Sequence, residues 1–241
     1  MSNLKSVTMP DSVTEIGEGC FSMTGIENLD FLSKSITRIP EMAFDACKFN
    51  TLIIPEHITH IGNDAFSYCA PTTVIVPNTV VSFGNYWLST GDNLTYIEMP
   101  VRAAGTFSSL SAETIILTDD GTTRLGTCAI NMWKNITTLT LPNCIKEIGD
   151  DAICGAEKLM ELNLPSELEK IGYAGIWLEN IETLTIPASV HTIANGAIQC
   201  PKLNELIIKT GSPFESKSKT ELAEEWGVSA SIITFENTAL N

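Results

Sequence analysis

The sequence predicts an α/β repeat solenoid, a coil with one parallel β-sheet, mostly β and irregular, built from about ten repeats of about 22 residues. Three observations lead to this fold class. One short motif recurs along nearly the whole chain, its apolar residues have the spacing of a strand, and a proline recurs at one place in it. A single short strand with its return path cannot bury both of its sides, whereas stacked copies can.

The repeat is clearest in four segments that read almost alike, residues 52–62, 139–149, 162–172 and 184–194. Aligning the chain on the proline of this motif gives one anchor position for each repeat. Seven repeats carry proline at the anchor, namely Pro10, Pro55, Pro77, Pro100, Pro142, Pro165 and Pro187. Three further repeats place Ser33, Thr118 and Lys209 there.

The residues before the anchor predict a short strand. In the repeat anchored at Pro55, apolar residues lie at Phe49, Leu52 and Ile54. Leu52 and Ile54 are two residues apart, so their side chains point to the same face of a strand. Proline then ends the strand, because it cannot donate a ladder hydrogen bond.

The residues after the anchor predict a return path. Ile58 and Ile61 follow as further core residues, and Gly62 comes next, where we expect a turn with positive φ. A short Ala65-Phe66 piece completes the repeat. The repeat after Pro100 departs from this pattern, because residues 101–117 lack the Ile-Gly step; the sequence leaves open a binding notch or a tolerated deletion that aromatic side chains fill.

The motif L-x-x-L-x-[IL]-P-x-x-[VIL]-x-x-I-G-x-x-A-F-x-x-C resembles the BspA-like, or Treponema-type, leucine-rich repeat over residues 4–208. The resemblance implies a right-handed leucine-rich-repeat solenoid, and the crossover rule for parallel strands gives the same hand. It also implies a bacterial or protist protein of the cell surface or a secreted one, with a role in adhesion and host interaction and no enzymatic activity. Residues 1–10 contain no apolar stretch of a signal peptide, so the sequence alone does not exclude a cytoplasmic location.

Composition excludes several classes of function. The chain has 29 Asp and Glu against 14 Lys and Arg, a formal net charge of −15. Nucleic acids and anionic membrane surfaces both require a basic patch, so neither is expected as a partner. No apolar run approaches the ~20 residues that span a bilayer, so no membrane insertion is expected.

No catalytic or metal-binding motif is found in the sequence. The chain has seven cysteines without a CxxC pair, so we expect free thiols, with Cys47 and Cys69 buried. Residues 56–60 read E-H-x-x-H, which is not the zinc-protease order, and a turn is expected there rather than the required helix. We therefore expect no enzyme, no catalytic residue, no metal site and no cofactor.

The repeat pattern divides the chain into a solenoid over residues 1–208 and a C-terminal capping segment of the same domain over residues 209–241. Within the cap, residues 220–226 predict a short helix and residues 231–235 a last strand. At the other end the repeat is already in register at Leu4. We therefore expect either further chain upstream or a covered edge, with possible self-association at the N-terminal edge of the solenoid.

The candidate site is the outer face of the sheet, where residues four and two before each anchor point away from the core. Threonine rows are ordinary sheet surface, but grouped exposed isoleucines suggest a contact surface. The predicted ligand-binding residues are Thr51, Ile53, Thr73, Ile75, Tyr96, Glu98, Thr114 and Ile116. We expect them to bind an extracellular protein or glycan; the alternative is a structural spacer that presents another domain.

Overall fold

The structure is a computed structural model that describes residues 3–89, 91–107 and 110–236. The fold is a β-solenoid of about 8 turns with repeats of ~22 residues and very little helix, as the sequence predicts. The predicted count of about ten includes two N-terminal repeats in which the structure has no strand before Arg38. The chain forms two compact units, residues 1–120 (the N-terminal unit) and residues 121–241 (the C-terminal unit).

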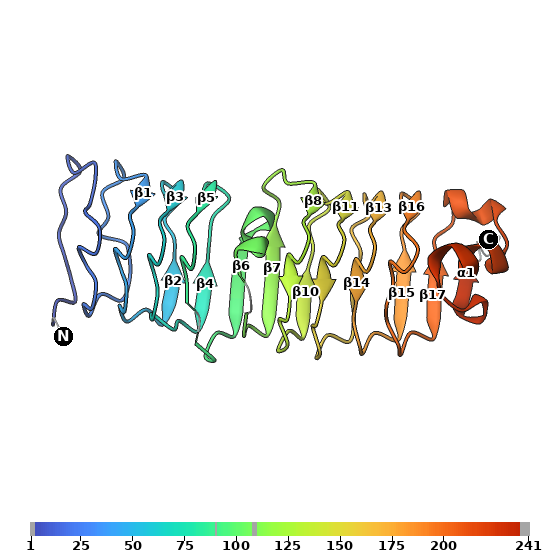
Figure 1. The fold of residues 1–241 in the computed structure, drawn as a ribbon. Coiled ribbons are helices and arrows are strands. Elements are labelled where there is room, and N and C mark those ends of the chain that lie inside the picture. The colour runs from blue at the N-terminus through green and yellow to red at the C-terminus, as the bar shows by residue number, and fades with distance from the viewer. Residues whose placement is uncertain (1–2, 90, 108–109, 237–241) are drawn as a thin grey trace, which may run out of the picture. The chain divides into compact units, whose positions relative to one another are not determined.

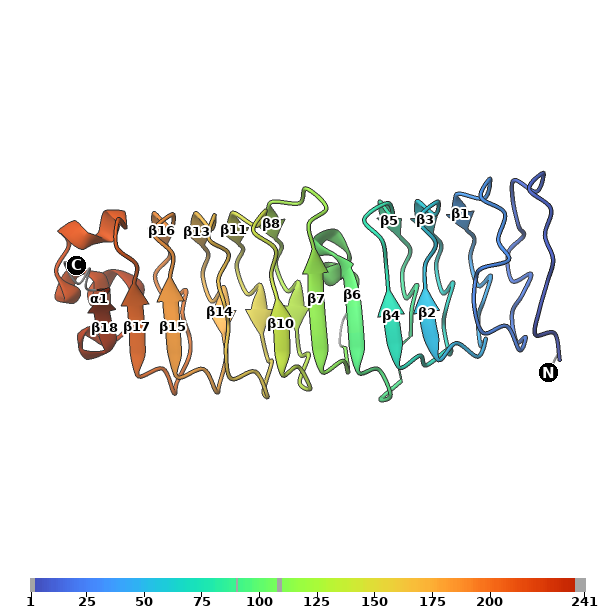
Figure 2. The same cartoon turned by 180° about the vertical axis from the view of Figure 1, so that it is seen from behind.

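The N-terminal unit contains two parallel ladders, which run side by side in Figures 1 and 2. The first pairs β1 (Arg38–Ile39), β3 (His60–Ile61) and β5 (Ser82–Phe83). The second, here called the strip sheet, pairs β2 (Thr51–Ile53), β4 (Thr73–Ile75), β6 (Tyr96–Pro100) and β7 (Thr114–Thr118). A 3-10 helix, η1 (Val101–Thr106), connects β6 to β7.

The C-terminal unit repeats this arrangement and adds a third ladder (Figure 1). One ladder is formed by β8 (Arg124–Leu125), β11 (Glu147–Ile148), β13 (Lys170–Ile171) and β16 (Thr192–Ile193). Another is formed by β9 (Ile130–Asn131), β12 (Ile153–Cys154) and β14 (Ile176–Trp177). The strands before the anchors are β10 (Thr138–Thr140), β15 (Thr183–Ile186) and β17 (Glu205–Ile208), and β18 (Ile233–Phe235) pairs with β17.

The prediction of one parallel sheet is therefore incomplete. The Ile-Gly step and the Ala-Ile step also form short ladders between successive turns, so a turn contributes up to three strands. These extra strands are only two residues long, and a two-residue strand has no alternation that sequence patterning can detect. The strands of the described residues pair in parallel, as expected for a coil in which each turn repeats the last.

The core lies inside each coil and follows the predicted apolar positions. Leu52, Ile58 and Phe66 are fully buried in the turn anchored at Pro55. Phenylalanine side chains stack along the coil from turn to turn: the rings of Phe44 and Phe66 lie 5.5 Å apart at an interplanar angle of 7°. Equivalent side chains of adjacent turns therefore contact one another, and each turn buries the apolar side of its neighbours.

The glycine after Ile61 serves a different purpose from the one predicted. Gly62 and Gly84 do not have positive φ. A Cβ atom at Gly84 would lie 2.3 Å from the backbone nitrogen of Asn63 in the preceding turn, so glycine is required by close backbone approach. Positive φ occurs two residues later, at Asp64 (φ 51°) and Tyr86 (φ 52°).

Aromatic side chains fill the irregular repeat after Pro100. Of the two alternatives, a binding notch or a tolerated deletion filled by aromatic side chains, the structure therefore favours the deletion. Trp87 is fully buried, and its ring centroid lies 5.4 Å from that of Phe107. The indole Nε1–H of Trp87 donates to Oγ1 of Thr106 in η1 (3.0 Å). The shortened connection is thus a packed part of the core.

Residues 209–236 cover the end of the last coil. They contain η2 (Pro213–Ser216), α1 (Lys219–Trp226) and η3 (Ala230–Ile232). Ser218 and Glu221 form a capping box at the start of α1. Leu222 and Trp226 of this helix are fully buried, so they shield the apolar interior of the last turn. Residues 237–241 of the predicted cap lie outside the described residues. Across the described ranges, none of the helices is both long and apolar enough to cross a membrane.

Candidate binding surface

The structure brings all eight predicted site residues together on the outer face of the strip sheet. They form two rows that cross the four strands β2, β4, β6 and β7. The hydroxyl row consists of Thr51, Thr73, Tyr96 and Thr114 in register. The isoleucine row consists of Ile53, Ile75, Glu98 and Ile116 in register. We call the two rows together the sheet-face strip; Figure 2 shows the strands that carry it.

The alternation of a strand explains why these side chains face outward. Leu52, Val74 and Ile97 are fully buried between the two rows, which places the residues on either side of each on the opposite face. Ile53 is 54% exposed, and Ile75 is partly exposed on the neighbouring strand. The strip therefore presents aliphatic side chains to solvent on adjacent strands.

The threonine hydroxyls of the strip are available to a ligand. The side chains of Thr51, Thr73 and Thr114 make no hydrogen bond within the described part of the chain. By contrast, the hydroxyls of Thr72 and Thr95, which lie outside the rows, donate to carbonyl oxygens of the preceding turn (3.0 and 3.1 Å). The hydroxyl row thus differs from threonines that stabilise the stack itself.

Tyr96 and Glu98 form the polar pair of the strip. The Tyr96 hydroxyl donates to Oε2 of Glu98 over 3.0 Å. Burial raises the pKa of Tyr96 above its ordinary value, and the hydrogen bond and the negative charge of Glu98 raise it further. In the isoleucine row Glu98 lies between Ile75 and Ile116. Among the described residues Glu98 takes part in no ion pair.

Two hollows meet at Ile53. One encloses about 660 Å³ and is lined by residues that include Glu27, Asp30 and Lys48. The other encloses about 320 Å³ beside Glu56 and Glu98. The strip is therefore an apolar surface edged mainly by carboxylates.

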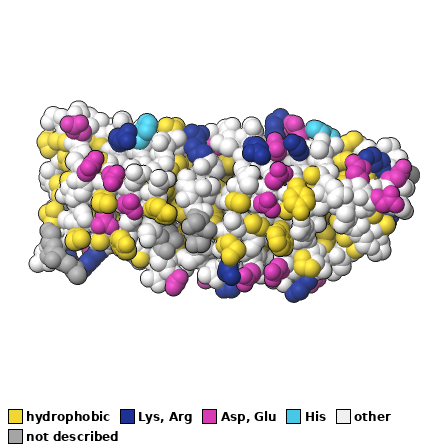
Figure 3. All heavy atoms as spheres, in the orientation of Figure 1, with side chains coloured by type: hydrophobic (Ala, Val, Ile, Leu, Met, Phe, Trp, Pro, Cys, Tyr) yellow, Lys and Arg dark blue, Asp and Glu magenta, His cyan; other side chains and the backbone are white. Residues whose placement is uncertain are grey.

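Other exposed hydrophobic residues are distributed differently. Tyr68 and Tyr86 are 80% and 73% exposed but belong to other sides of their turns, outside the strip. On the face seen in Figure 3, hydrophobic side chains are scattered among acidic ones rather than gathered in rows. The strip is distinguished by neighbouring outward isoleucines in strand register.

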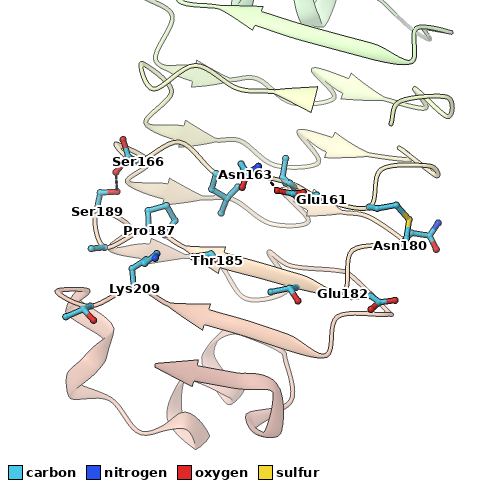
Figure 4. A pocket seen from close by; sticks show the side chains of 15 residues that line it. Glu161, Asn163, Ser166, Asn180, Glu182, Thr185, Pro187, Ser189 and Lys209 are labelled. Carbon is cyan, nitrogen blue, oxygen red and sulfur yellow. Dashed lines mark hydrogen bonds between the residues drawn. The ribbon is translucent and has the colours of Figure 1, made fainter. Parts of the chain in front are cut away.

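Sequence reasoning did not select a groove of about 990 Å³ in the C-terminal unit. Figure 4 shows Glu161, Asn163, Thr185 and Lys209 around it, in the segment 161–166 and on strand β15 and the end of β17. Residues 161–164 form no strand, although the equivalent segments on either side do. Several of these residues lie four or two positions before an anchor and are therefore expected to point outward. No periodic signal in the sequence predicts that residues 161–164 fail to form a strand.

Many polar groups of this groove are bonded to one another. The amide of Asn163 donates to Oε1 of Glu161 (2.9 Å), and the hydroxyl of Ser189 donates to the carbonyl of Ser166 (2.7 Å; Figure 4). Lys209 pairs with Glu236. Glu161, Ser189 and Lys209 of the groove are therefore engaged with other groups of the chain.

Ion pairs link successive turns in the C-terminal unit. Glu147 accepts from Arg124 of one neighbouring turn (3.1 Å) and lies 3.4 Å from Nζ of Lys170 of the other. The hydrogen bond from Arg124 is the main cause that holds the pKa of Glu147 below its ordinary value. Lys146 and Glu169 pair in the same way at 2.8 Å. The carboxylates of Glu147 and Glu169 therefore form ion pairs between neighbouring turns.

Within the described ranges, no three His, Cys, Asp or Glu side chains are arranged to hold a metal ion. The seven cysteines all lie in the described ranges, and no disulfide joins them there. Cys47 and Cys69 are buried, and each thiol donates to a carbonyl oxygen of the preceding turn, that of Phe21 or Phe44, over 3.1 Å. Cys47 and Cys69 are thus buried, as the sequence predicts.

Stacked parallel ladders around an apolar interior define a solenoid repeat protein. Its repeats are those of the family described as BspA type leucine rich repeat region, and the chain belongs to that family. The family profile, which holds six copies of the repeat, matches residues 1–95, 24–130 and 123–218. This is a repeat family, and no enzyme family is indicated.

Three solved structures are similar to this chain at low sequence identity, and the first of them shares its fold. A leucine-rich repeat protein from Bacteroides ovatus matches 97% of this chain and 72% of its own, with 16% identity and a TM-score of 0.55. A leucine rich cell surface protein from Faecalibacterium prausnitzii matches 98% and 80%, with 16% identity and a TM-score of 0.41. The pneumococcal vaccine antigen PcpA matches 96% and 68%, with 17% identity and a TM-score of 0.40. A comparison with curated proteins found no match.

Proposed function

We propose that the protein is a non-enzymatic binding module of a surface or secreted protein, which recognises a protein or glycan through the sheet-face strip and acts in adhesion or host interaction. The observation that supports it is the pair of rows on the strip sheet: Ile53 and Ile75 lie exposed on adjacent strands beside uncommitted threonine hydroxyls. The surface or secreted location follows from the family resemblance of the repeats.

The chemistry of the strip suits a macromolecular partner. Grouped exposed aliphatic side chains stabilise a complex because their apolar surface is buried when the partner binds. Neighbouring hydroxyls supply directional hydrogen bonds. Tyr96, within the hydroxyl row, is one of the residue types enriched at the energetic centres of protein interfaces. The rows of the strip cross four adjacent strands, which favours an extended partner over a small enclosed ligand.

A structural spacer remains the second candidate. The sheet face of the C-terminal unit supports it, because Thr183 and Thr185 form an ordinary outward threonine surface on β15. A spacer needs the stacked turns and nothing from the isoleucine row.

The experiment compares the wild-type chain with the double variant Ile53→Ser/Ile75→Ser on a panel of purified extracellular matrix proteins and a glycan array. We expect at least one panel member to bind, and the double variant to weaken it about tenfold or more. The matched control is Ile207→Ser, since Ile207 has the same place in its repeat, faces outward and is partly exposed. Equal binding by wild type and double variant, or no binding by either, favours the spacer.

A further inference from the structure

We propose that the sheet-face strip takes a polypeptide segment in which a lysine or arginine lies between aliphatic side chains, and that Glu98 binds the cationic group. The inference deepens the proposed function and rests on it. It selects a cationic amphipathic segment of a protein over a glycan.

The first argument is the position of Glu98 in its row. The row reads Ile53, Ile75, Glu98, Ile116 across four adjacent strands. One carboxylate thus interrupts a run of outward aliphatic side chains. A partner that covers the isoleucines also removes water from Glu98. The carboxylate must then be compensated by a cation of the partner, because an unpaired desolvated charge opposes binding.

The second argument is that the chain does not supply this cation. Glu98 accepts a hydrogen bond from Tyr96 and belongs to no ion pair within the described ranges. Arg102, close in sequence, is committed to Asp120 at 2.6 Å. Lys48 lines the hollow at the far end of the row, with Glu27 and Asp30.

The third argument is the charge of the surroundings. Residues 1–120 contain 14 Asp and Glu and 5 Lys and Arg. Glu27, Asp30 and Glu56, which line the hollows beside the strip, belong to no ion pair among the described residues. In the C-terminal unit, by contrast, Glu147 and Glu169 are paired with cations of neighbouring turns. The strip therefore attracts a cationic partner and repels nucleic acid or a sulfated or sialylated glycan.

The fourth argument concerns neutral glycans. Sugars bind best where an aromatic ring is free to stack against them, and the strip has one aromatic residue, Tyr96. Its hydroxyl is held by Glu98, and its neighbours in the row are the threonines of β4 and β7. Aliphatic and anionic groups dominate the rest of the strip, and both complement a polypeptide.

The test measures binding of labelled peptides to the full chain by fluorescence anisotropy. The probe is a peptide of about twelve residues that alternates leucine and serine around one central lysine. Two matched peptides carry norleucine or glutamate at the centre. We expect the lysine peptide to bind about tenfold more tightly than either. Glu98→Gln should abolish this preference, and Glu98→Lys should transfer it to the glutamate peptide.

Glu205→Gln is the control variant, since Glu205 is also partly exposed on a sheet face and should leave the lysine preference unchanged. Thermal unfolding establishes that each variant is folded. Lysine preference that survives Glu98→Gln, or that falls equally in Glu205→Gln, overturns the inference, as does the failure of every peptide to bind. A further outcome also overturns the inference: the lysine and norleucine peptides bind equally, and the double variant Ile53→Ser/Ile75→Ser weakens the binding of both. That outcome leaves the proposed function standing.

Discussion

Glycine at the step after the second core isoleucine is constrained by the adjacent turn. The backbone nitrogen of Asn63 is so near Gly84 that a Cβ atom there would clash with it. A hydrogen bond joins the same two turns, because the amide N–H of Asn85 donates to Oδ1 of Asn63 over 2.9 Å. Successive turns therefore approach through main chain and a short polar side chain at this corner.

Gly84→Ala should lower the free energy of unfolding by about 1–3 kcal/mol or more, because the added methyl group forces the turns apart. Chemical denaturation measures the loss. Gly17→Ala is the control, since Gly17 occupies the same place in its repeat but nothing lies within 4 Å of the added atom. Equal losses for the two variants would contradict the close-approach explanation.

Cys69 should be protected from alkylation in the folded chain. Burial raises the pKa of its thiol to about 12, so the reactive thiolate is scarce at pH 8. Mass spectrometry after iodoacetamide treatment should show little modification of Cys69 without denaturant and full modification with it. Exposed Cys128 is the control and should be modified in both conditions. Rapid native labelling of Cys69 would contradict its burial.

The same pKa shift predicts alkaline destabilisation. The folded state retains the thiol proton more strongly than the unfolded state, whose pKa is near 9.0. This contribution to stability is complete below pH 9 and is lost as pH rises from 9 towards 12. Denaturation of Cys69→Ala over this range should show a smaller pH dependence than wild type, and an unchanged dependence would count against the assignment.

At the scale of strands, burial alternates between core and surface as the motif predicts in the strip sheet, but not in every repeat. Leu162 is buried, but Leu164, which has the core position just before the anchor proline, is partly exposed. It lies in the segment that forms no strand and lines the C-terminal groove. The apolar spacing of this repeat matches its neighbours, so the sequence pattern could not reveal the interruption.

Leu162→Ala should lower the free energy of unfolding by about 2–5 kcal/mol through lost burial and the cavity left behind. Thr183→Ala, on the outer face of the adjacent strand, should cost under about 1 kcal/mol. Urea denaturation ranks the two. The reverse order would mean that the inward and outward faces are exchanged.

The ion pairs that join β8, β11 and β13 predict that the free energy of unfolding decreases in acid. The folded-state pKa of Glu147 is lowered by Arg124 and Lys170, so its contribution is present above the unfolded value of 4.5 and lost as pH falls through the folded value. Glu147→Gln should reduce the loss of stability between neutral pH and pH 3, by under about 1 kcal/mol because the pair is exposed. Glu161→Gln, which removes no ion pair, is the control. An identical acid dependence in Glu147→Gln and wild type would contradict the assignment.

For the whole molecule, the sequence predicts the solenoid, its repeat length and the rows of the sheet-face strip, because each is a periodic property. Three features are beyond it. The two-residue strands such as His60–Ile61 are too short to show a period. The corner at Gly84 depends on the distance between turns. The groove near Asn163 depends on a ladder that fails to form locally. The repeated motif thus predicts the features that all turns have in common. The features that differ between turns depend on contacts between neighbouring turns.

Removal of one whole turn should be tolerated, because each turn contacts its immediate neighbours. Deleting residues 165–186 joins Leu164 to Pro187 and preserves the Leu-Pro step of the motif. We expect a cooperatively folded protein with unchanged peptide binding at the strip. Deleting residues 165–175 removes half a turn and should prevent folding of the C-terminal unit. Circular dichroism and thermal melting measure both outcomes, and equal disruption by the two deletions would contradict a stack of interchangeable turns.

The glycine corner has a mechanical consequence for each unit. Where the main chains of Gly84 and Asn63 already touch, the stack cannot be compressed, and the bond from Asn85 to Asn63 resists extension. When the N-terminal unit bends, we therefore expect the spacing between these two turns to change little at this corner.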